Sequence, residues 1–430
     1  MIKRLVLLVA ASLCLVLHSE EAIKPVLKEG QRVAVVGDSI TEQKQYSKFI
    51  ELYLTGCLPQ LNLHVIQLGW GGETAAGFAR RMENDLMPYH PNVVTTCYGM
   101  NDGGYRKFDD GIGKNYETPM RDILTRLKKA EAVVVVGGPG AVDSRFFRFN
   151  KDEPVTAMSV TYNDNLKHLD EIAKKLAVEF GFNHANVHDL MAEAQIEAKK
   201  KFGPDYDVCG HDGVHPGPNG HLLMAYAFLK AMGIDGQIGT ITVDMKGSAQ
   251  ATDGHKVLSS ADGKTELEST RYAFCFSGDE KSAGGTRSIL PFVPFNQDLN
   301  RFVLIVKNLD GDKAKVTWGS ESQSFSKTEL EKGVNLTEHF FNNPFMPAFN
   351  NLERAVAVKQ NYETGMIKQS INPMMQIPVS INNFLDKDAE ALAALETIKK
   401  KYWEKYERMH QNVRAALQPV KHTISVAVEK

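Results

Sequence analysis

The sequence predicts an α/β fold in which helices cover both faces of a parallel sheet in three layers, followed by an extension that is first β-rich and then helical. Between residues 32 and 232, short apolar runs alternate with segments of helical spacing, which indicates repeated βα units. From about residue 238, short apolar segments are separated by turns rich in Gly, Asp and Ser. From about residue 342, apolar residues recur at helical intervals.

The composition agrees with a globular protein. The chain has 430 residues, enough for two domains or for one large domain with an extension. Hydrophobic residues make up 43% and charged residues 24%, so an ordinary core can form. Because the formal net charge is only −2, we expect neither nucleic acid nor an anionic membrane as a partner.

The N-terminus has the layout of a secretory signal peptide. Lys3 and Arg4 precede an apolar run over 5–17, an order typical of export signals. We predict a cleaved signal peptide over residues 1–22 and an exported protein, periplasmic or secreted. A lipid anchor on Cys14 is the disfavoured alternative, because the residue before it is bulky. No later apolar run is long enough to span a bilayer, so we expect no membrane contact after cleavage.

Four cysteines follow that segment: Cys57, Cys97, Cys209 and Cys275. In an exported protein they permit three pairing schemes, between which the sequence does not choose. No CxxC pair and no His/Cys spacing typical of zinc is present. We expect neither a metal ion nor a cofactor.

The first predicted strand, 33–36, leads into the segment that organises the rest. Its four β-favouring apolar residues predict a strand buried on both faces. Gly37-Asp38-Ser39 ends the strand, and 42–54 has the pattern of a helix. Ser39 therefore lies at the carboxyl end of the sheet, where open α/β proteins bind ligands. The alternative is that Ser39 is only a helix N-cap.

The other elements of the first half follow in order. Strands are predicted at 63–68, 92–98, 132–136 and 184–188. Helices are predicted at 74–86, 118–129, 162–180, 191–201 and 220–232. Since the carboxyl ends of parallel strands share one edge of a sheet, the loops after these strands gather around Ser39.

Those loops carry residues that suit acyl transfer. The loop after the second strand supplies a flexible backbone donor at Gly72, and the loop after the third strand supplies the Asn101 amide. After the fifth strand and its helix come Asp212 and His215, a carboxylate and an imidazole three residues apart. With Ser39 as nucleophile, this set is sufficient for acyl transfer.

Four segments, in this order, resemble the four blocks of the SGNH hydrolases, the GDSL-type esterases and lipases. They are Gly37-Asp38-Ser39-Ile40, Gly69-Trp70-Gly71-Gly72, Gly99-Met100-Asn101-Asp102 and Asp212-Gly213-Val214-His215. The resemblance covers about 32–232 and implies a flavodoxin-like fold.

The resemblance also implies a role for each residue. Ser39 matches the nucleophile, His215 the general base, and Asp212 the group that orients the imidazole. The Ser39 N–H, the Gly72 N–H and the Asn101 amide match the oxyanion donors.

Some assignments near these blocks stay open. Ile40 replaces the leucine of the first block, and Gln67 stands near where many relatives carry asparagine, so Gly71 is the alternative to Gly72. Trp70 is interpreted either as a platform for a sugar ring or as a packing residue. We expect Asp38 to bond backbone amides at its turn.

The second half is predicted to be an extension of the hydrolase domain. We divide the chain into the signal peptide, a hydrolase domain at 28–237, a β-rich insertion or small sandwich at 238–341, and a helical region at 342–430. Strands are predicted at 240–245, 272–276, 301–306, 314–318 and 423–428. Helices are predicted at 342–369 and from a cap at Asp386 to about residue 418. The apolar stripe of the last helix predicts docking on the preceding helix or the main domain, rather than a coiled-coil dimer.

The sequence thus predicts an exported serine esterase that hydrolyses O-acyl esters, most of all O-acetyl groups on a carbohydrate. The expected partner is a small-molecule or glycan ester, and the oligomeric state stays open. The alternatives are a lipase or thioesterase for longer acyl chains, or a non-catalytic glycan-binding protein that keeps the fold.

Overall fold

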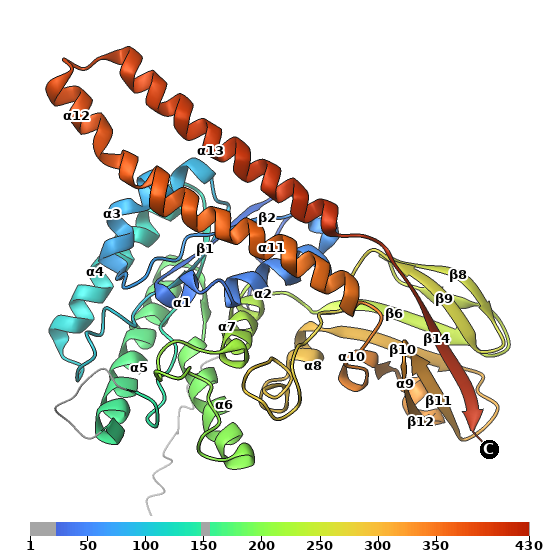
Figure 1. The fold of residues 1–430 in the computed structure, drawn as a ribbon. Helices are drawn as coiled ribbons and strands as arrows, with labels where there is room; N and C mark the ends of the chain where they lie inside the picture. The colour runs from blue at the N-terminus through green and yellow to red at the C-terminus, as the bar shows by residue number, and fades with distance from the viewer. Residues whose placement is uncertain (1–22, 148–154, 430) are drawn as a thin grey trace, which may run out of the picture.

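The computed structural model describes residues 23–147 and 155–429. The predicted signal peptide at 1–22 lies outside the described residues. A parallel sheet occupies the first half, and two further sheets and a long helical hairpin follow it (Figure 1).

The first sheet has the strand order β2-β1-β3-β4-β5, and all its pairings are parallel. Its strands are β1 Arg32–Gly37, β2 His64–Gln67, β3 Val93–Cys97, β4 Val133–Gly137 and β5 Asn183–Ala185. Val33 and Val35 of β1 lie in one buried cluster, and Ala34 and Val36 lie in the other. Successive residues of a strand face opposite sides, so both faces of this sheet are covered.

The covering helices form the two outer layers. They are α1 Ser39–Glu42, α2 Tyr46–Leu52, α3 Ala75–Asp85, α4 Asp110–Lys129, α5 Val155–Phe180, α6 Val187–Phe202 and α7 Pro218–Ala231. Helices α2, α6 and α7 contribute to the cluster of Val33, and α3 and α4 to the cluster of Ala34. The predicted three-layer flavodoxin-like fold is confirmed.

The predicted strand at 184–188 is wrong in its second half. β5 ends at Ala185, and the side chain of Asn186 accepts a hydrogen bond from the Asp189 N–H, which caps α6. An N-cap of this kind begins a helix even where the following residues favour strands.

Two sheets make up the β-rich part. One has the order β13-β10-β6-β7 and the other β12-β11-β14-β9-β8. The strands are β6 Gln237–Asp244, β7 Ala249–Ala251, β8 His255–Ala261, β9 Lys264–Ser269, β10 Arg301–Lys307, β11 Lys313–Trp318, β12 Glu321–Ser326, β13 Val334–Asn335 and β14 Val420–Glu429. The predicted final strand at 423–428 is therefore β14, which pairs with both β11 and β9.

The predicted strand at 272–276 is wrong. This buried segment pairs with no strand of the described chain. The Tyr272 N–H donates to the Gly56 carbonyl, and the Asn300 side chain bonds both backbone groups of Phe274. The backbone is satisfied by a loop and an amide instead of a neighbouring strand.

A long hairpin of helices precedes the final strand β14. It consists of α11 Met346–Met366, a π-helical turn at Ile367–Ile371, α12 Ile377–Phe384 and α13 Ala389–Ala416. Helices α11 and α13 run side by side in opposite directions (Figure 1). The Tyr406 hydroxyl of α13 donates to the Val65 carbonyl of β2, so the predicted docking of this helix is confirmed.

The cap of α13 is Asp388, not the predicted Asp386. The Asp388 carboxylate accepts the N–H groups of Glu390 and Ala391. Asp386 has a φ of 51° and belongs to the turn. Among the described residues, no helix is long and apolar enough to cross a membrane.

Candidate active site

The edge of the first sheet brings Ser39, His215 and Asp212 together. Ser39 Oγ lies 2.8 Å from His215 Nε2, and His215 Nδ1 lies 2.6 Å from Asp212 Oδ2. Ser39 begins α1 directly after β1, and Asp38 caps that helix by accepting the Ile40 N–H, as predicted. A hydroxyl, an imidazole and a carboxylate in this order can activate the hydroxyl as a nucleophile.

The loop that carries His215 is fixed by its own backbone. Asp212 Oδ1 accepts the N–H groups of Val214 and His215, both at 2.9 Å. A side chain at Gly210, which has a φ of 84°, would stand 1.6 Å from the His215 carbonyl oxygen. Only glycine fits this close approach at a positive φ.

The charge on Asp212 is favoured by the same contacts. Burial opposes ionisation, but the backbone and ring N–H groups of His215 and the Val214 N–H hold the pKa of Asp212 below its ordinary value. Hydrogen bonds to a carboxylate favour its charged form. Asp212 therefore carries a negative charge next to the imidazole at neutral pH.

The glycine loop after β2 lies against α1. A side chain at Gly69 would stand 2.2 Å from the Glu42 nitrogen, so glycine is required there. The Gly71 N–H donates to Glu42 Oε2 at 2.5 Å. In the described chain, no protein acceptor is found for the N–H groups of Ser39 and Gly72, so Gly72 is the better candidate donor of the two glycines.

Asn101 connects three of the loops. Its Nδ2 donates to the Glu73 carbonyl at 3.0 Å and makes a long contact of 3.4 Å with Asp38 Oδ2, while its Oδ1 accepts from the Tyr105 hydroxyl. Burial raises the pKa of Asp38 to about 7, with the Ile40 N–H opposing the shift and the charges of Asp102 and Glu73 adding to it.

Sequence reasoning missed the function of Asp102 in this framework. Its two oxygens accept the Ala75 and Gly99 N–H groups, both at 3.0 Å. The carboxylate therefore ties the loop after β3 to the start of α3. Burial raises the pKa of Asp102 to about 6 despite these hydrogen bonds. Its position directly after Asn101 was the signal in the sequence.

Trp70 is held by cationic side chains. Its ring centroid lies 5.1 Å from the Arg81 guanidinium carbon and 4.9 Å from Lys368 Nζ. These contacts fix the Trp70 ring, which also packs against the buried cluster of Ala34. Both observations favour the packing interpretation of Trp70. Lys368 comes from the extension, and nothing in the sequence placed it here.

Two neighbouring histidines bond to partners other than Ser39. His221 accepts the Tyr46 N–H at Nδ1 and contacts Gln43 Oε1 through Nε2, and burial lowers its pKa to about 3. His211 is fully exposed and pairs with Asp207. The structure places only His215 of the three against Ser39.

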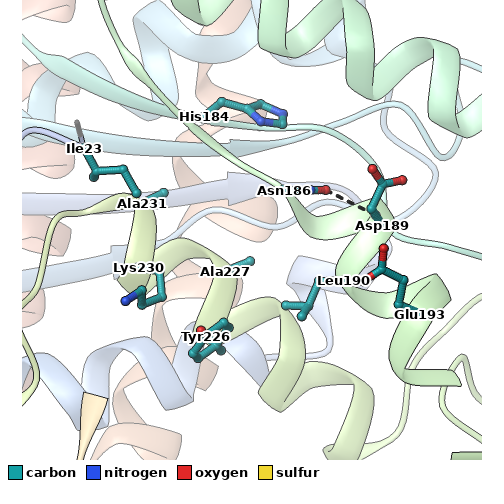
Figure 2. A pocket seen from close by; sticks show the side chains of 10 residues that line it. All are labelled: Ile23, His184, Asn186, Asp189, Leu190, Glu193, Tyr226, Ala227, Lys230 and Ala231. Atoms are coloured by element: carbon teal, nitrogen blue, oxygen red, sulfur yellow. Dashed lines mark hydrogen bonds between the residues drawn. The ribbon is translucent and has the colours of Figure 1, made fainter. Parts of the chain in front are cut away.

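A separate cavity of about 280 Å³ lies beside β5, α6 and α7 (Figure 2). It is lined by Ile23, His184, Asn186, Asp189, Leu190, Glu193, Tyr226, Ala227, Lys230 and Ala231. None of the predicted site residues lines it.

The four cysteines are all buried and free.

The fold and the serine–histidine–aspartate arrangement define a serine hydrolase of the SGNH type. Residues 35–223, which make up less than half of the chain, match the model of the GDSL-like lipase/acylhydrolase family. By class, the protein is a carboxylic ester hydrolase.

The chain is similar to several known proteins, two of which follow. An acetylxylan esterase of Geobacillus stearothermophilus is 22% identical over 228 residues, which cover 48% of this chain and 95% of the esterase. The structure of BT4096, a gut microbial diltiazem-metabolizing enzyme, matches with a TM-score of 0.69 and 21% identity, covering 95% of this chain and 99% of the other. The fold of the extension is thus shared with a solved protein.

Proposed function

We propose that the protein removes O-acyl groups, above all O-acetyl groups, from a carbohydrate through an acyl-serine intermediate. The hydrogen-bonded chain from Ser39 through His215 to Asp212 carries this proposal. His215 Nε2 takes the proton from Ser39 Oγ as Oγ bonds to the carbonyl carbon of the ester. The same proton then goes to the leaving alkoxide when the C–O bond breaks.

Water completes the reaction. His215 removes a proton from a water molecule, whose oxygen attacks the acyl carbon, and the proton returns to Ser39 Oγ as the acid leaves. The negative oxygen formed in both steps would be stabilised by the N–H groups of Ser39 and Gly72. The Asn101 amide is the third donor, through the hydrogen that makes only the long contact with Asp38.

A short acyl group on a polar scaffold suits this site. Gly71 and Gly72 are exposed, and none of the exposed large hydrophobic residues of the described chain lies in the loops that carry Ser39, Gly72, Asn101 or His215. A long acyl chain would need an apolar surface beside the nucleophile. The similar acetylxylan esterase also supports this proposal. The basic and apolar residues at 1–22 support export.

The test is release of acid from acetylated glycans and from p-nitrophenyl esters of increasing chain length. Wild type should release acetate, and Ser39→Ala and His215→Asn should abolish it. His211→Asn is the matched control, because this exposed histidine lies four residues away and should be dispensable. Turnover in Ser39→Ala would contradict the mechanism, rates that rise with chain length would favour a lipase or thioesterase, and glycan binding without turnover would favour a binding protein.

A further inference from the structure

Lys368 of the extension lies next to the glycine loop, 4.9 Å from the ring centroid of Trp70. Lys368 Nζ, in the turn that follows α11, lies 2.6 Å from Glu42 Oε1. Glu42 is the last residue of α1, the helix that begins with Ser39. Its other oxygen, Oε2, accepts the Gly71 N–H. One carboxylate thus links Lys368, the nucleophile helix and the peptide next to Gly72.

Gly72 itself has little to hold it. It is exposed, its φ is 71°, and no atom lies within 4 Å of where a side chain would begin. The direction of its N–H therefore depends on the neighbouring peptide, which the Gly71–Glu42 hydrogen bond fixes. An oxyanion donor works only when it is held in position before the negative charge develops.

Lys368 also balances the charge of Glu42. A carboxylate next to an oxyanion site would oppose the developing negative charge, and a lysine within 2.6 Å offsets this repulsion. The two side chains are 28% and 25% exposed, so solvent screens the pair only in part.

A second contact holds the start of the same loop. The Gln67 side chain donates to the Gln360 carbonyl and to Thr364 Oγ1 of α11, and its Oε1 accepts the Gly69 N–H. Gln67, one of the two residues that depart from the family pattern, therefore binds the extension.

We propose that Lys368 is a positioning residue for ester hydrolysis, which holds Glu42 in place and neutralises its charge. Glu42 in turn fixes the peptide at Gly71, so that the Gly72 N–H points toward the oxyanion. This inference rests on the proposed function, since the aim of Gly72 matters only if an oxyanion forms. It makes the C-terminal extension a part of the active site.

The test compares Lys368→Met, Lys368→Arg, Glu42→Gln and the double variant Lys368→Met/Glu42→Gln in the full chain. The control is Glu353→Gln, which breaks the Lys48–Glu353 ion pair, also 2.6 Å long and also between the hydrolase domain and α11. The readouts are kcat and KM for p-nitrophenyl acetate, the Kd of an alkyl boronic acid that mimics the tetrahedral intermediate, and Tm.

We expect Lys368→Met to lower kcat about tenfold and to weaken boronate binding by a similar factor, with KM and Tm unchanged. Lys368→Arg should restore most of kcat, and Glu353→Gln should match wild type. The effects of Lys368→Met and Glu42→Gln should not add, because both act through one contact.

Two results would overturn the inference alone: wild-type kcat in Lys368→Met, or a loss that follows Tm and also occurs in Glu353→Gln. If wild type itself hydrolyses no ester, the proposed function fails and the inference fails with it. If wild type is active and Ser39→Ala is not, the proposed function stands whatever the lysine variants show.

Discussion

At the scale of single residues, Asp212 uses its two carboxylate oxygens for different purposes. Oδ1 accepts two backbone N–H groups and shapes the loop, and Oδ2 accepts the ring N–H of His215. This arrangement fixes the imidazole so that Nε2 is free to take a proton from Ser39. A substitution can therefore remove one contribution and keep the other.

The substitution Asp212→Asn separates these two functions of the carboxylate. The asparagine Oδ1 still accepts the Val214 and His215 N–H groups, but its NH₂ faces Nδ1 and selects the wrong tautomer. We expect kcat to fall on the order of 10³- to 10⁴-fold with little change in Tm. Steady-state kinetics and thermal unfolding of the same preparation would measure both. A loss of less than about tenfold would show that Asp212 does not orient the base.

The site residues could be predicted because each lies in a short segment whose neighbours identify it. Ser39 follows an apolar strand, and Asp212 and His215 are three residues apart. Lys368 could not be predicted, since it is 326 residues from Glu42 and no local pattern joins them. Asp102 was visible beside Asn101, but its hydrogen bonds to Ala75 and Gly99 depend on the packed loops.

At the scale of elements, α13 is anchored on β2 by a pair of stacked rings, of which the His410 ring is buried. The His410 ring stacks on His64 with centroids 3.9 Å apart, and both His410 nitrogens are buried without a hydrogen-bond partner in the described chain. Burial, with the charges of His64 and Lys359 adding to it, lowers the pKa of His410 to about 3. The neutral ring is thus part of the interface.

Because folded His410 resists protonation, wild type should lose stability as the pH falls. An unfolded histidine takes up its proton near about pH 6.5, and folded His410 only near pH 3. The contribution of neutral His410 to the free energy of unfolding is therefore complete above about pH 6.5. It is lost as the pH falls toward 3, at about 1 kcal/mol per pH unit. His410→Phe, which keeps a ring but cannot titrate, should lose less stability than wild type between pH 6.5 and 4.

Urea unfolding at several pH values would measure this difference. His211→Phe is the control for replacing a histidine by phenylalanine, because the His211 side chain is exposed. Equal slopes for wild type and His410→Phe would contradict the assignment.

Most elements of the first half were predicted from periodicity, but β7, β8, β9 and β12 were not predicted, and several errors arose at element ends. The strand at 184–188 was too long because its last residues favour strands, while the Asn186 cap begins a helix. The cap of α13 was placed two residues early, since Asp386 and Asp388 are equally good caps by residue type. The segment at 272–276 has a strand's composition, but Asn300 and Gly56 supply its partners.

At the scale of the whole molecule, a buried ionic cluster joins the extension to the hydrolase domain. Lys359 of α11 lies 2.8 Å from Glu51 of α2 and 2.5 Å from Glu363, and all three side chains are at most 1% exposed. Lys359 also donates to the Val65 carbonyl of β2. Burial raises the pKa of Glu363, and the charge of Lys359 opposes this shift.

Removing the charge of Lys359 should lower the free energy of unfolding. Lys359→Met leaves two buried carboxylates without their cation, and we expect a loss of about 3–5 kcal/mol in the free energy of unfolding. Adding Glu51→Gln and Glu363→Gln should recover part of it, because no buried charge is then left unpaired. Denaturant unfolding of the single and triple variants would measure both effects. A single variant as stable as wild type would show that the cluster does not hold the two parts together.

The sequence predicted an extension with a strand at its end, but not which strands that last strand would pair with. β14 comes from the end of the chain and pairs between β11 and β9, so the β-rich part is completed only after the helical hairpin. Alternation within 423–428 predicts a strand, but its neighbours are set by long-range packing.

The acyl-serine intermediate is tested most directly by finding the acyl group on Ser39. Wild type would be mixed with p-nitrophenyl acetate, quenched in acid within the first turnovers, digested and analysed by mass spectrometry, with Ser39→Ala treated in parallel. We expect one acetyl group on the peptide that contains Ser39, and none in the variant. Turnover without acetylation of Ser39 in rapidly quenched samples, or acetylation at another residue that forms as fast as product, would contradict it.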